Sequence, residues 1–176
     1  MKLVLGVLFI SCLAWSQTLT SKGSISLGGE IAYSETKINA NSTHVLQLSP
    51  QASYFVGQNL ELGLALAYTS SRQSVYSTSN TGVGPFLVRY MSDNNIKPFI
   101  GFSYLLVVNN QKAVFSDFNY REEKNAFSFM AGFLFPLNEK FAVQPVLQYT
   151  LYTGYGIRSL GDLTQILFGV GFKGFL

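Results

Sequence analysis

The sequence predicts an all-β protein, an eight-stranded antiparallel up-and-down barrel, and two observations carry this prediction. Eight stretches alternate large apolar residues with small or polar ones, which is the period-two pattern of strands with two different faces. The connections between the stretches are alternately short and long, as in a row of hairpins. The expected strands are residues 23–36, 44–56, 60–69, 83–91, 96–108, 126–137, 141–152 and 165–176.

Each expected strand has one face of large apolar side chains. In strands one to four this face comprises Ile25, Leu27, Ile31 and Tyr33; Leu46, Leu48, Ala52 and Tyr54; Leu60, Leu62, Leu64, Leu66 and Tyr68; and Phe86, Val88 and Tyr90. In strands five to eight it comprises Ile100, Phe102, Tyr104 and Leu106; Phe127, Phe129, Phe133 and Phe135; Val143, Leu147, Tyr149 and Leu151; and Ile166, Phe168, Val170 and Phe172. In the fourth strand, Leu87, Arg89 and Met91 form the opposite face.

The connections differ in both length and composition. Residues 57–59, 93–95 and 138–140 are short and rich in Gly, Asn and Asp, which accept the backbone angles of tight turns. Residues 37–43, 70–82, 109–125 and 153–164 are longer and polar. Short turns on one side and long loops on the other are typical of barrels that cross a membrane.

The composition of the second face indicates which side of the wall meets lipid. That face is mostly Gly, Ala, Ser, Thr and Gln, and the whole chain is only 12% charged, about half of the usual share in a soluble domain. Small side chains would fit the narrow interior of an eight-stranded barrel, so the large apolar face is expected to point into lipid. The fold class is therefore predicted to be an eight-stranded antiparallel up-and-down transmembrane β-barrel.

The aromatic residues on the apolar face are expected to form two girdles. Tyr33, Tyr68, Tyr104 and Tyr149 fall toward the ends with long loops, and Tyr54, Tyr90, Phe135, Phe141 and Phe172 toward the ends with short turns. Rings gather at both interfaces of a membrane in barrels of this kind.

The N-terminus is typical of an export signal. Lys2 precedes an apolar stretch at residues 3–15, and Ala14 and Ser16 supply the small residues before a cleavage site. We therefore expect a signal peptide at 1–16 and a barrel domain at 17–176. The only cysteine, Cys12, lies within the expected signal, so the mature chain would have neither disulfide nor thiol chemistry.

Several segments resemble the small outer-membrane β-barrel domain family of Gram-negative bacteria, the OmpA/OmpX type. They are residues 23–29, 49–56, 59–64 and 84–90, and the final strand with Phe168-Gly169-Val170-Gly171-Phe172. The resemblance implies a monomer in the bacterial outer membrane that contacts outer-membrane lipid and lipopolysaccharide. It also implies insertion by the barrel-assembly machinery, which reads a C-terminal signal that usually ends on an aromatic residue; here Leu176 follows Phe175. Members of the family include tethers, adhesins and serum-resistance factors, so the fold does not define the function.

Five charged residues are expected to point into the lumen: Glu30, Glu61, Arg89, Lys97 and Lys173. Charges that share a narrow interior must pair, because an unpaired buried charge is costly. We expect an ion-pair network of Glu61 with Arg89 and Lys173, joined by Glu30, that closes the lumen. The alternative for Lys97 and Lys173 is that they extend to the water at the turn side.

Recognition is expected in the long loops. Their aromatic residues are Tyr76, Phe115, Phe118 and Tyr120, and aromatic side chains on loops held by a rigid scaffold suit binding. The alternative is that they fold back over the mouth of the barrel or lie in the lipopolysaccharide layer.

Other chemistry has little support in the sequence. The single histidine, His44, is followed by Val45-Leu46 and therefore does not match the His-x-Ser pattern of outer-membrane deacylases. No ligand set for a metal or cofactor is apparent in the sequence. A net charge of +3 without a basic cluster argues against nucleic acid. The expected function is a structural or surface-interaction role rather than an enzymatic one. A narrow channel or carrier for small hydrophobic molecules, and a lipid-modifying enzyme, are the alternatives.

Overall fold

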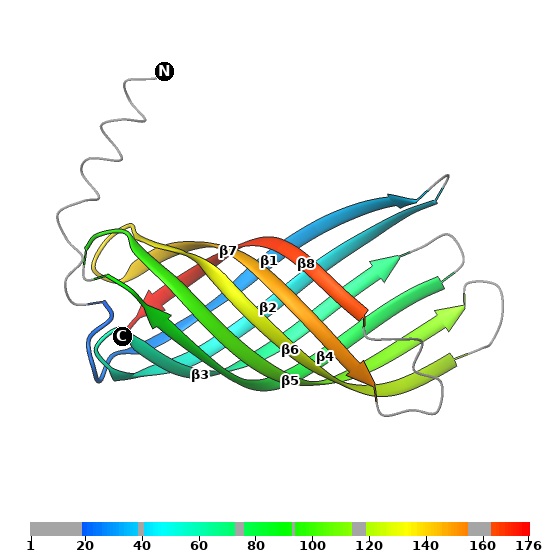
Figure 1. Cartoon of the computed structure of the whole chain (residues 1–176), viewed down its shortest axis with the longest axis horizontal. Helices are drawn as coiled ribbons and strands as arrows, with labels where there is room; N and C mark the ends of the chain where they lie inside the picture. The colour runs from blue at the N-terminus through cyan, green and yellow to red at the C-terminus, as the bar shows by residue number, and fades with distance from the viewer. Residues whose placement is uncertain (1–18, 39–40, 73–75, 93, 114–118, 155–162) are drawn as a thin grey trace, which may run out of the picture.

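The computed structural model describes residues 19–38, 41–72, 76–92, 94–113, 119–154 and 163–176, and contains eight strands (Figure 1). They are β1 Ile25–Ile38, β2 Asn41–Gly57, β3 Leu60–Arg72, β4 Tyr76–Tyr90, β5 Lys97–Ala113, β6 Asn119–Pro136, β7 Phe141–Gly154 and β8 Leu163–Phe175. The expected signal peptide, 1–16, lies outside the described residues. In the described ranges, no helix is long and apolar enough to cross a membrane.

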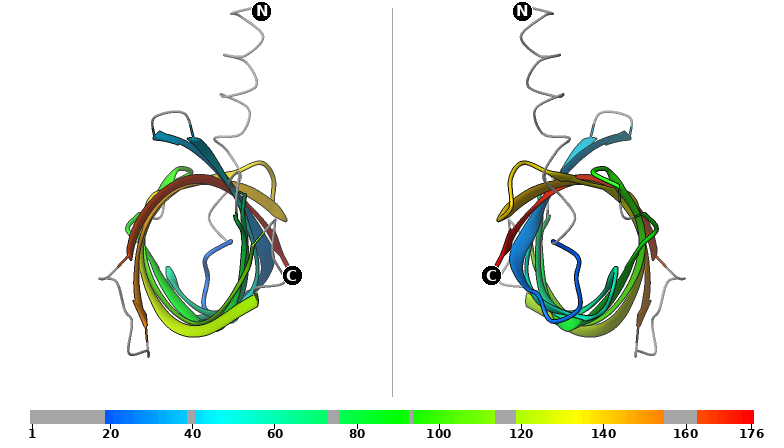
Figure 2. Two further views of the ribbon diagram at one scale, coloured as in Figure 1. Left: turned by 90° about the vertical axis from the view of Figure 1, so that its right-hand side faces the viewer. Right: turned by 90° about the vertical axis from the view of Figure 1, so that its left-hand side faces the viewer.

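Each strand pairs in antiparallel fashion with the next, and β1 pairs with β8 to close the barrel. Viewed along its axis, the sheet forms a complete ring (Figure 2). The predicted fold class is therefore confirmed. One end of the barrel, the turn end, carries the connections β2–β3, β4–β5 and β6–β7 together with the C-terminus; the other is the loop end.

The two faces of the wall are distributed as expected in seven of the eight strands. In β3, for example, Leu62, Leu64 and Leu66 are exposed on the outside, whereas Glu61 and Ala65 are buried in the lumen. Because the side-chain period of a strand is two, this alternation places one set of residues on the outer surface of the barrel and the other in the interior. Of the expected girdle residues, Tyr54, Phe141 and Phe172 are exposed on the outside near the turn end, and Tyr33, Tyr68 and Tyr149 are exposed toward the loop end.

Strand β4 is reversed relative to the prediction. Phe86, Val88 and Tyr90 are buried in the lumen, so Tyr90 is not a girdle residue, and Arg89 lies on the outside. Both faces of this strand carry large apolar side chains, so the composition of β4 alone does not indicate which face points into the lumen. The neighbouring strand supplies the physical reason: Gly63 pairs with Phe86 and leaves room for its ring.

The expected long loops are largely continuations of the strands. Only residues 39–40, 73–75, 114–118 and 155–162 fall between the strands at the loop end. The Ser, Thr and Asn residues of these segments extend the hairpin ladders, as in the pairing of Ser70 with Ser79 and of Asn110 with Arg121. Polar residues can continue a ladder beyond the apolar band because their backbone groups pair as well as those of apolar residues.

The seam that closes the barrel is shorter than the other ladders. Pairing between β1 and β8 runs from Ser26 with Phe175 to Ala32 with Gly169 and then stops. The same register would bring Tyr33 next to Phe168 and Ile38 next to Leu163. Instead, the β1–β2 hairpin projects outward from the ring at the loop end (Figures 1 and 2). The loop-side half of the seam is therefore open.

Candidate functional site

An apolar layer closes the lumen at the turn end. It consists of Leu19, Phe55, Tyr90, Phe99, Leu134 and Phe175, all buried. The ring of Phe55 stacks on that of Tyr90 with centroids 5.9 Å apart and contacts Phe175 at 6.2 Å. This layer fills the cross-section with side chains from five strands and from the N-terminal segment, so it acts as a floor of the lumen.

The N-terminal segment 19–24 is held across this mouth by backbone hydrogen bonds. The amide of Gly23 donates to the carbonyl of Phe55 at 2.9 Å, and the amide of Asn59 donates to the carbonyl of Thr20 at 2.9 Å. Asn59 has a φ of 59°, the left-handed conformation that Asn tolerates in tight turns. In Figure 2 the segment lies inside the outline of the ring.

Above the floor, Glu61 is the centre of a buried polar cluster. Its side chain is 0% exposed. Lys173 Nζ donates to both carboxylate oxygens at 2.5 Å, and the Tyr90 hydroxyl donates to Oε2 at 2.7 Å. Ser26 and Ser53 donate to Oε1. The carboxylate therefore has charge compensation and a set of donors, which a buried anion requires.

Lys173 is equally enclosed. Its side chain is 4% exposed, and Nζ also contacts the Tyr90 hydroxyl at 3.0 Å. The ammonium lies 5.9 Å from the ring centre of Phe86 and 5.7 Å from that of Tyr90, which is within the range of cation–π attraction. The pair joins β3 to β8 across the lumen and is surrounded by aromatic rings.

The structure brings together two of the five residues predicted for the ion-pair network, Glu61 and Lys173. Glu30 is buried nearby and accepts a hydrogen bond from Gln51 Nε2 at 3.0 Å. Lys97 is buried at the turn end, where Nζ donates to the carbonyl of Ser92 at 3.3 Å, so it does not extend into the water.

The expectation for Arg89 was wrong. Its guanidinium is on the outer surface, where Nη1 donates to the carbonyl of Gln58 at 3.0 Å. The reversal of β4 removed Arg89 from the lumen and placed the Tyr90 hydroxyl there instead. The sequence analysis did not place Tyr90 in the lumen. The signal for this placement is Gly63, which lies opposite Phe86 in the next strand and leaves room for an inward ring; Tyr90 is on the same face of β4 as Phe86.

The loop-side half of the lumen is filled by uncharged polar side chains. Gln148 Nε2 donates to Ser128 Oγ at 3.0 Å, and Gln47 Nε2 donates to Gln148 Oε1 at 3.4 Å. Two cavities remain among these residues, with volumes of about 20 and 30 Å³. A water molecule needs roughly 10–15 Å³ by this measure, so each cavity has room for one or two waters.

Two buried oxygen atoms have no protein partner among the described residues, Asn80 Oδ1 and Gln144 Oε1. Asn80 lines the smaller cavity. Ordered water satisfies such groups in protein interiors. The described part of the lumen is thus a core of hydrogen-bonded polar side chains with buried apolar residues such as Leu105 and Val107 beside them.

The predicted recognition residues are outside what the structure describes. Phe115 and Phe118 lie between β5 and β6, and Tyr76 and Tyr120 lie within β4 and β6 at positions where side chains are not described. The described part of the β5–β6 hairpin carries an ion pair between Glu122 and Lys124 at 2.9 Å and a hydrogen bond from the Tyr104 hydroxyl to Asn125 at 2.7 Å. No group of three potential metal ligands occurs among the described residues.

Comparison with known proteins shows the class of fold. No family profile and no curated protein sequence matches this chain. Among solved structures, Neisserial surface protein A aligns over 87% of this chain and 99% of its own with a TM-score of 0.66 at 11% identity. The outer membrane protein OprG of Pseudomonas aeruginosa aligns over 91% and 98% with a TM-score of 0.58 at 11% identity.

The N-terminal β-barrel domain of OprF from Pseudomonas aeruginosa aligns over 88% of this chain and 98% of its own, with a TM-score of 0.57 at 16% identity. The fold is that of the small eight-stranded outer-membrane β-barrels, as the resemblance in the sequence implied. At these identities the likeness concerns the fold.

Proposed function

We propose that this protein is an integral barrel of the bacterial outer membrane whose lumen is a structural core and whose loop-end hairpins bind other molecules at the cell surface. The observation that carries the proposal is the filled lumen. A side-chain floor, a buried ion pair and a hydrogen-bonded polar layer follow one another along the axis.

A solute that crossed this lumen would have to displace each layer. It would separate Lys173 from Glu61, which leaves a charge buried without its partner and costs about 3–5 kcal/mol. It would also move the segment 19–24 out of the floor, where Leu19 is buried. These costs argue for a scaffold and against a general diffusion pore.

The hairpins at the loop end supply the surface for interaction. β5 and β6 are 17 and 18 residues long, whereas about 9–11 residues are enough to cross a membrane as a tilted strand. The extra length continues the rigid ladder beyond the apolar band, and polar contacts such as the one between Tyr104 and Asn125 anchor it. Positions presented on a rigid scaffold suit recognition.

The lumen is tested with purified protein in planar bilayers. We expect no stepwise conductance from the wild type, and none from a variant that lacks residues 19–22 and carries Phe55→Gly, because the Glu61–Lys173 pair and the polar layer remain in the lumen. Steps of reproducible size from the wild type would contradict the closed lumen.

The hairpins are tested separately. Replacing residues 114–118 with Asn-Gly should leave the heat-modifiable band of the folded barrel intact and reduce adhesion of expressing cells to host-derived or abiotic surfaces. Adhesion unchanged after the corresponding replacement in each of the four hairpins would contradict a surface-interaction role.

A second candidate, a carrier for small hydrophobic molecules, is favoured by the open half of the β1–β8 seam. The ladder ends at Ala32 and Gly169, so an opening of the wall beyond this pair would give access from the lumen to the loop-end interface of the membrane. A Tyr33→Cys/Phe168→Cys variant places cysteines at the first register position beyond the β1–β8 ladder. If the carrier role holds, oxidation of the two cysteines to a disulfide should close the seam and abolish uptake of a lipophilic fluorophore, and reduction should restore uptake. Equal uptake in the oxidised and reduced states, or uptake equal to that of cells without the barrel, would remove this candidate.

A further inference from the structure

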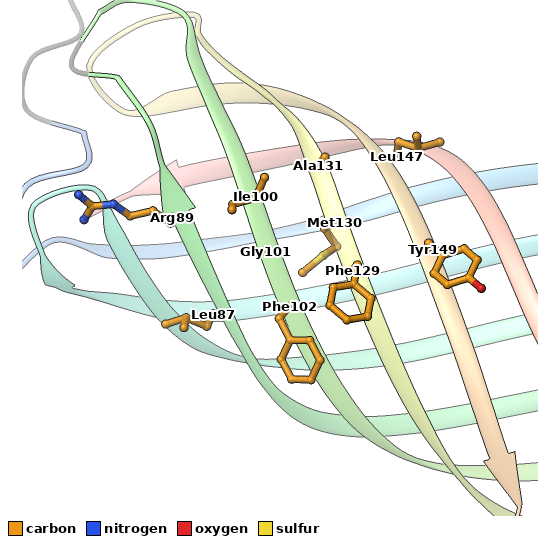
Figure 3. A pocket seen from close by; sticks show the side chains of 10 residues that line it. All are labelled: Leu87, Arg89, Ile100, Gly101, Phe102, Phe129, Met130, Ala131, Leu147 and Tyr149. Carbon is orange, nitrogen blue, oxygen red and sulfur yellow. The ribbon is translucent and has the colours of Figure 1, made fainter.

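The outer wall has a groove of about 580 Å³ over β4 to β7, which we call the Arg89 groove (Figure 3). Two rows of paired residues border it. One row is Arg89, Ile100, Ala131 and Leu147, each directly opposite the next across three ladders. The adjacent row is Leu87, Phe102, Phe129 and Tyr149.

The groove exists because a small residue interrupts one of these rows. Ala131 stands on the outside among the larger side chains of Ile100, Leu147 and Phe129. The large rings of Phe102 and Phe129, 5.5 Å apart between centroids, form one bank. A narrow apolar trough with aromatic banks suits a flexible hydrocarbon chain better than a folded protein surface.

The groove climbs from the turn end toward the middle of the wall. Arg89 is next to the last residue of β4 at the turn end, whereas Leu147 lies six residues beyond Phe141, the start of β7. Figure 3 shows Arg89 at the turn side of the labelled residues, with its guanidinium directed away from them and the apolar side chains following toward the loop end. The groove therefore has a cationic end at the turn-side interface and an apolar end at mid-depth.

The cationic end has capacity for an anion. Arg89 is exposed, and its hydrogen bond to the carbonyl of Gln58 uses one nitrogen, Nη1. A guanidinium has five N–H donors in a planar fork that matches phosphate oxygens. The Gln58 carbonyl holds the fork at the interface without neutralising its charge.

We propose that the Arg89 groove binds one glycerophospholipid of the turn-side leaflet, with its phosphate on Arg89 and one acyl chain lying over Ala131. This inference rests on the membrane placement proposed above and adds a defined lipid site to it. The order of charge and apolar surface along the groove matches the order of headgroup and chain in that leaflet.

Native mass spectrometry of the detergent-purified barrel tests the site, with phosphatidylglycerol as the probe and diacylglycerol of the same chains as the probe without phosphate. We expect the wild type to retain phosphatidylglycerol after delipidation and to release diacylglycerol. Arg89→Gln should lower occupancy about tenfold, because a charge-assisted phosphate contact is lost. Ala131→Phe should also remove one bound lipid, because its ring fills the trough.

Two matched variants serve as controls. Lys22→Gln removes an exposed cation outside the groove, and Leu64→Phe adds a ring on β3, on another part of the wall; both should retain the lipid. Retention by Arg89→Gln equal to that of the wild type, or equal retention of diacylglycerol, would overturn the proposal. A barrel that shows no heat-modifiable band in membrane extracts would contradict the membrane placement itself, which is a separate outcome.

Discussion

Lys173 in the last strand donates to both carboxylate oxygens of Glu61 in the third strand, 112 residues earlier in the chain. This contact crosses the lumen between strands that are not neighbours in the sheet. It adds an ionic connection across the lumen to the ladders between adjacent strands, as the hydrogen bond from Gln47 to Gln148 connects β2 to β7.

Removing one partner of this pair should destabilise the barrel strongly. Lys173→Met leaves Glu61 buried without its cation and should lower the free energy of unfolding by about 3–5 kcal/mol. The Lys173→Met/Glu61→Leu double variant should recover most of this loss, because apolar replacements of both partners are often neutral. Urea unfolding in lipid vesicles measures the difference. The control is Lys140→Met, which replaces an exposed lysine in the β6–β7 turn. A double variant with the same free energy of unfolding as Lys173→Met would refute the compensation.

Tyr90→Phe should cost about 1–3 kcal/mol, because the Glu61 carboxylate loses a buried charge-assisted hydrogen bond. The ring stacking with Phe55 is retained in this variant, so the measured loss belongs to the hydroxyl. Tyr54→Phe, on the lipid-facing side, should change the unfolding midpoint little. Equal effects of the two substitutions would mean that the hydroxyl of Tyr90 does not stabilise the cluster.

Gly63→Ala should destabilise the barrel by about 1–3 kcal/mol, the range for overpacking. A Cβ at this position would lie 2.5 Å from the carbonyl oxygen of Ala52 and 2.6 Å from the ring of Phe86. Gly57→Ala is the matched control, since its Cβ would meet only Leu60 at 3.7 Å, an ordinary contact. The temperature at which the folded gel band disappears compares the two; a lower temperature for Gly57→Ala would contradict the explanation.

Leu19→Ala should lower stability by about 2–4 kcal/mol, as for other fully buried leucines, if the N-terminal segment belongs to the core of the barrel. The loss should be accompanied by faster proteolysis of the N-terminus, because the segment 19–24 would be released from the turn end. Lys22→Ala, three residues later on the exposed side, should affect neither measurement. An unchanged free energy of unfolding for Leu19→Ala would show that segment 19–24 does not contribute to the core of the barrel.

Most of the fold was predictable because the pattern of a membrane barrel is redundant. In β3, five large apolar residues alternate with Glu61, Gly63, Ala65, Ala67 and Thr69, and a single assignment of faces satisfies them all. The strand ends at the loop side were less predictable. Ser and Thr occur both in loops and in strands outside the apolar band, and the boundary depends on pairing with a partner strand rather than on composition.

The candidate site was predictable only in part. Glu61 and Lys173 are charged residues on otherwise small-residue faces, so their inward direction follows from alternation. In β4 both faces are bulky, and alternation cannot assign them. Which face of β4 points into the lumen depends on residues of the neighbouring strand β3: Gly63 leaves room for Phe86, and Glu61 accepts the hydrogen bond of Tyr90. The sequence of β4 alone does not contain this information.

The position of Lys173 has a consequence for the order of assembly. The lysine lies three positions before Leu176, in the strand that also forms the short closing seam with β1. The ladders of β2 with β3 and of β3 with β4 join residues close in sequence, whereas Lys173 and Glu61 are 112 residues apart, and such distant contacts carry a larger entropy cost of loop closure. Until β8 is in place, the acid at position 61 has no ammonium to offset it. Placement of the final strand therefore both closes the ring and neutralises its interior, so an incompletely assembled barrel differs from a finished one in charge as well as in shape.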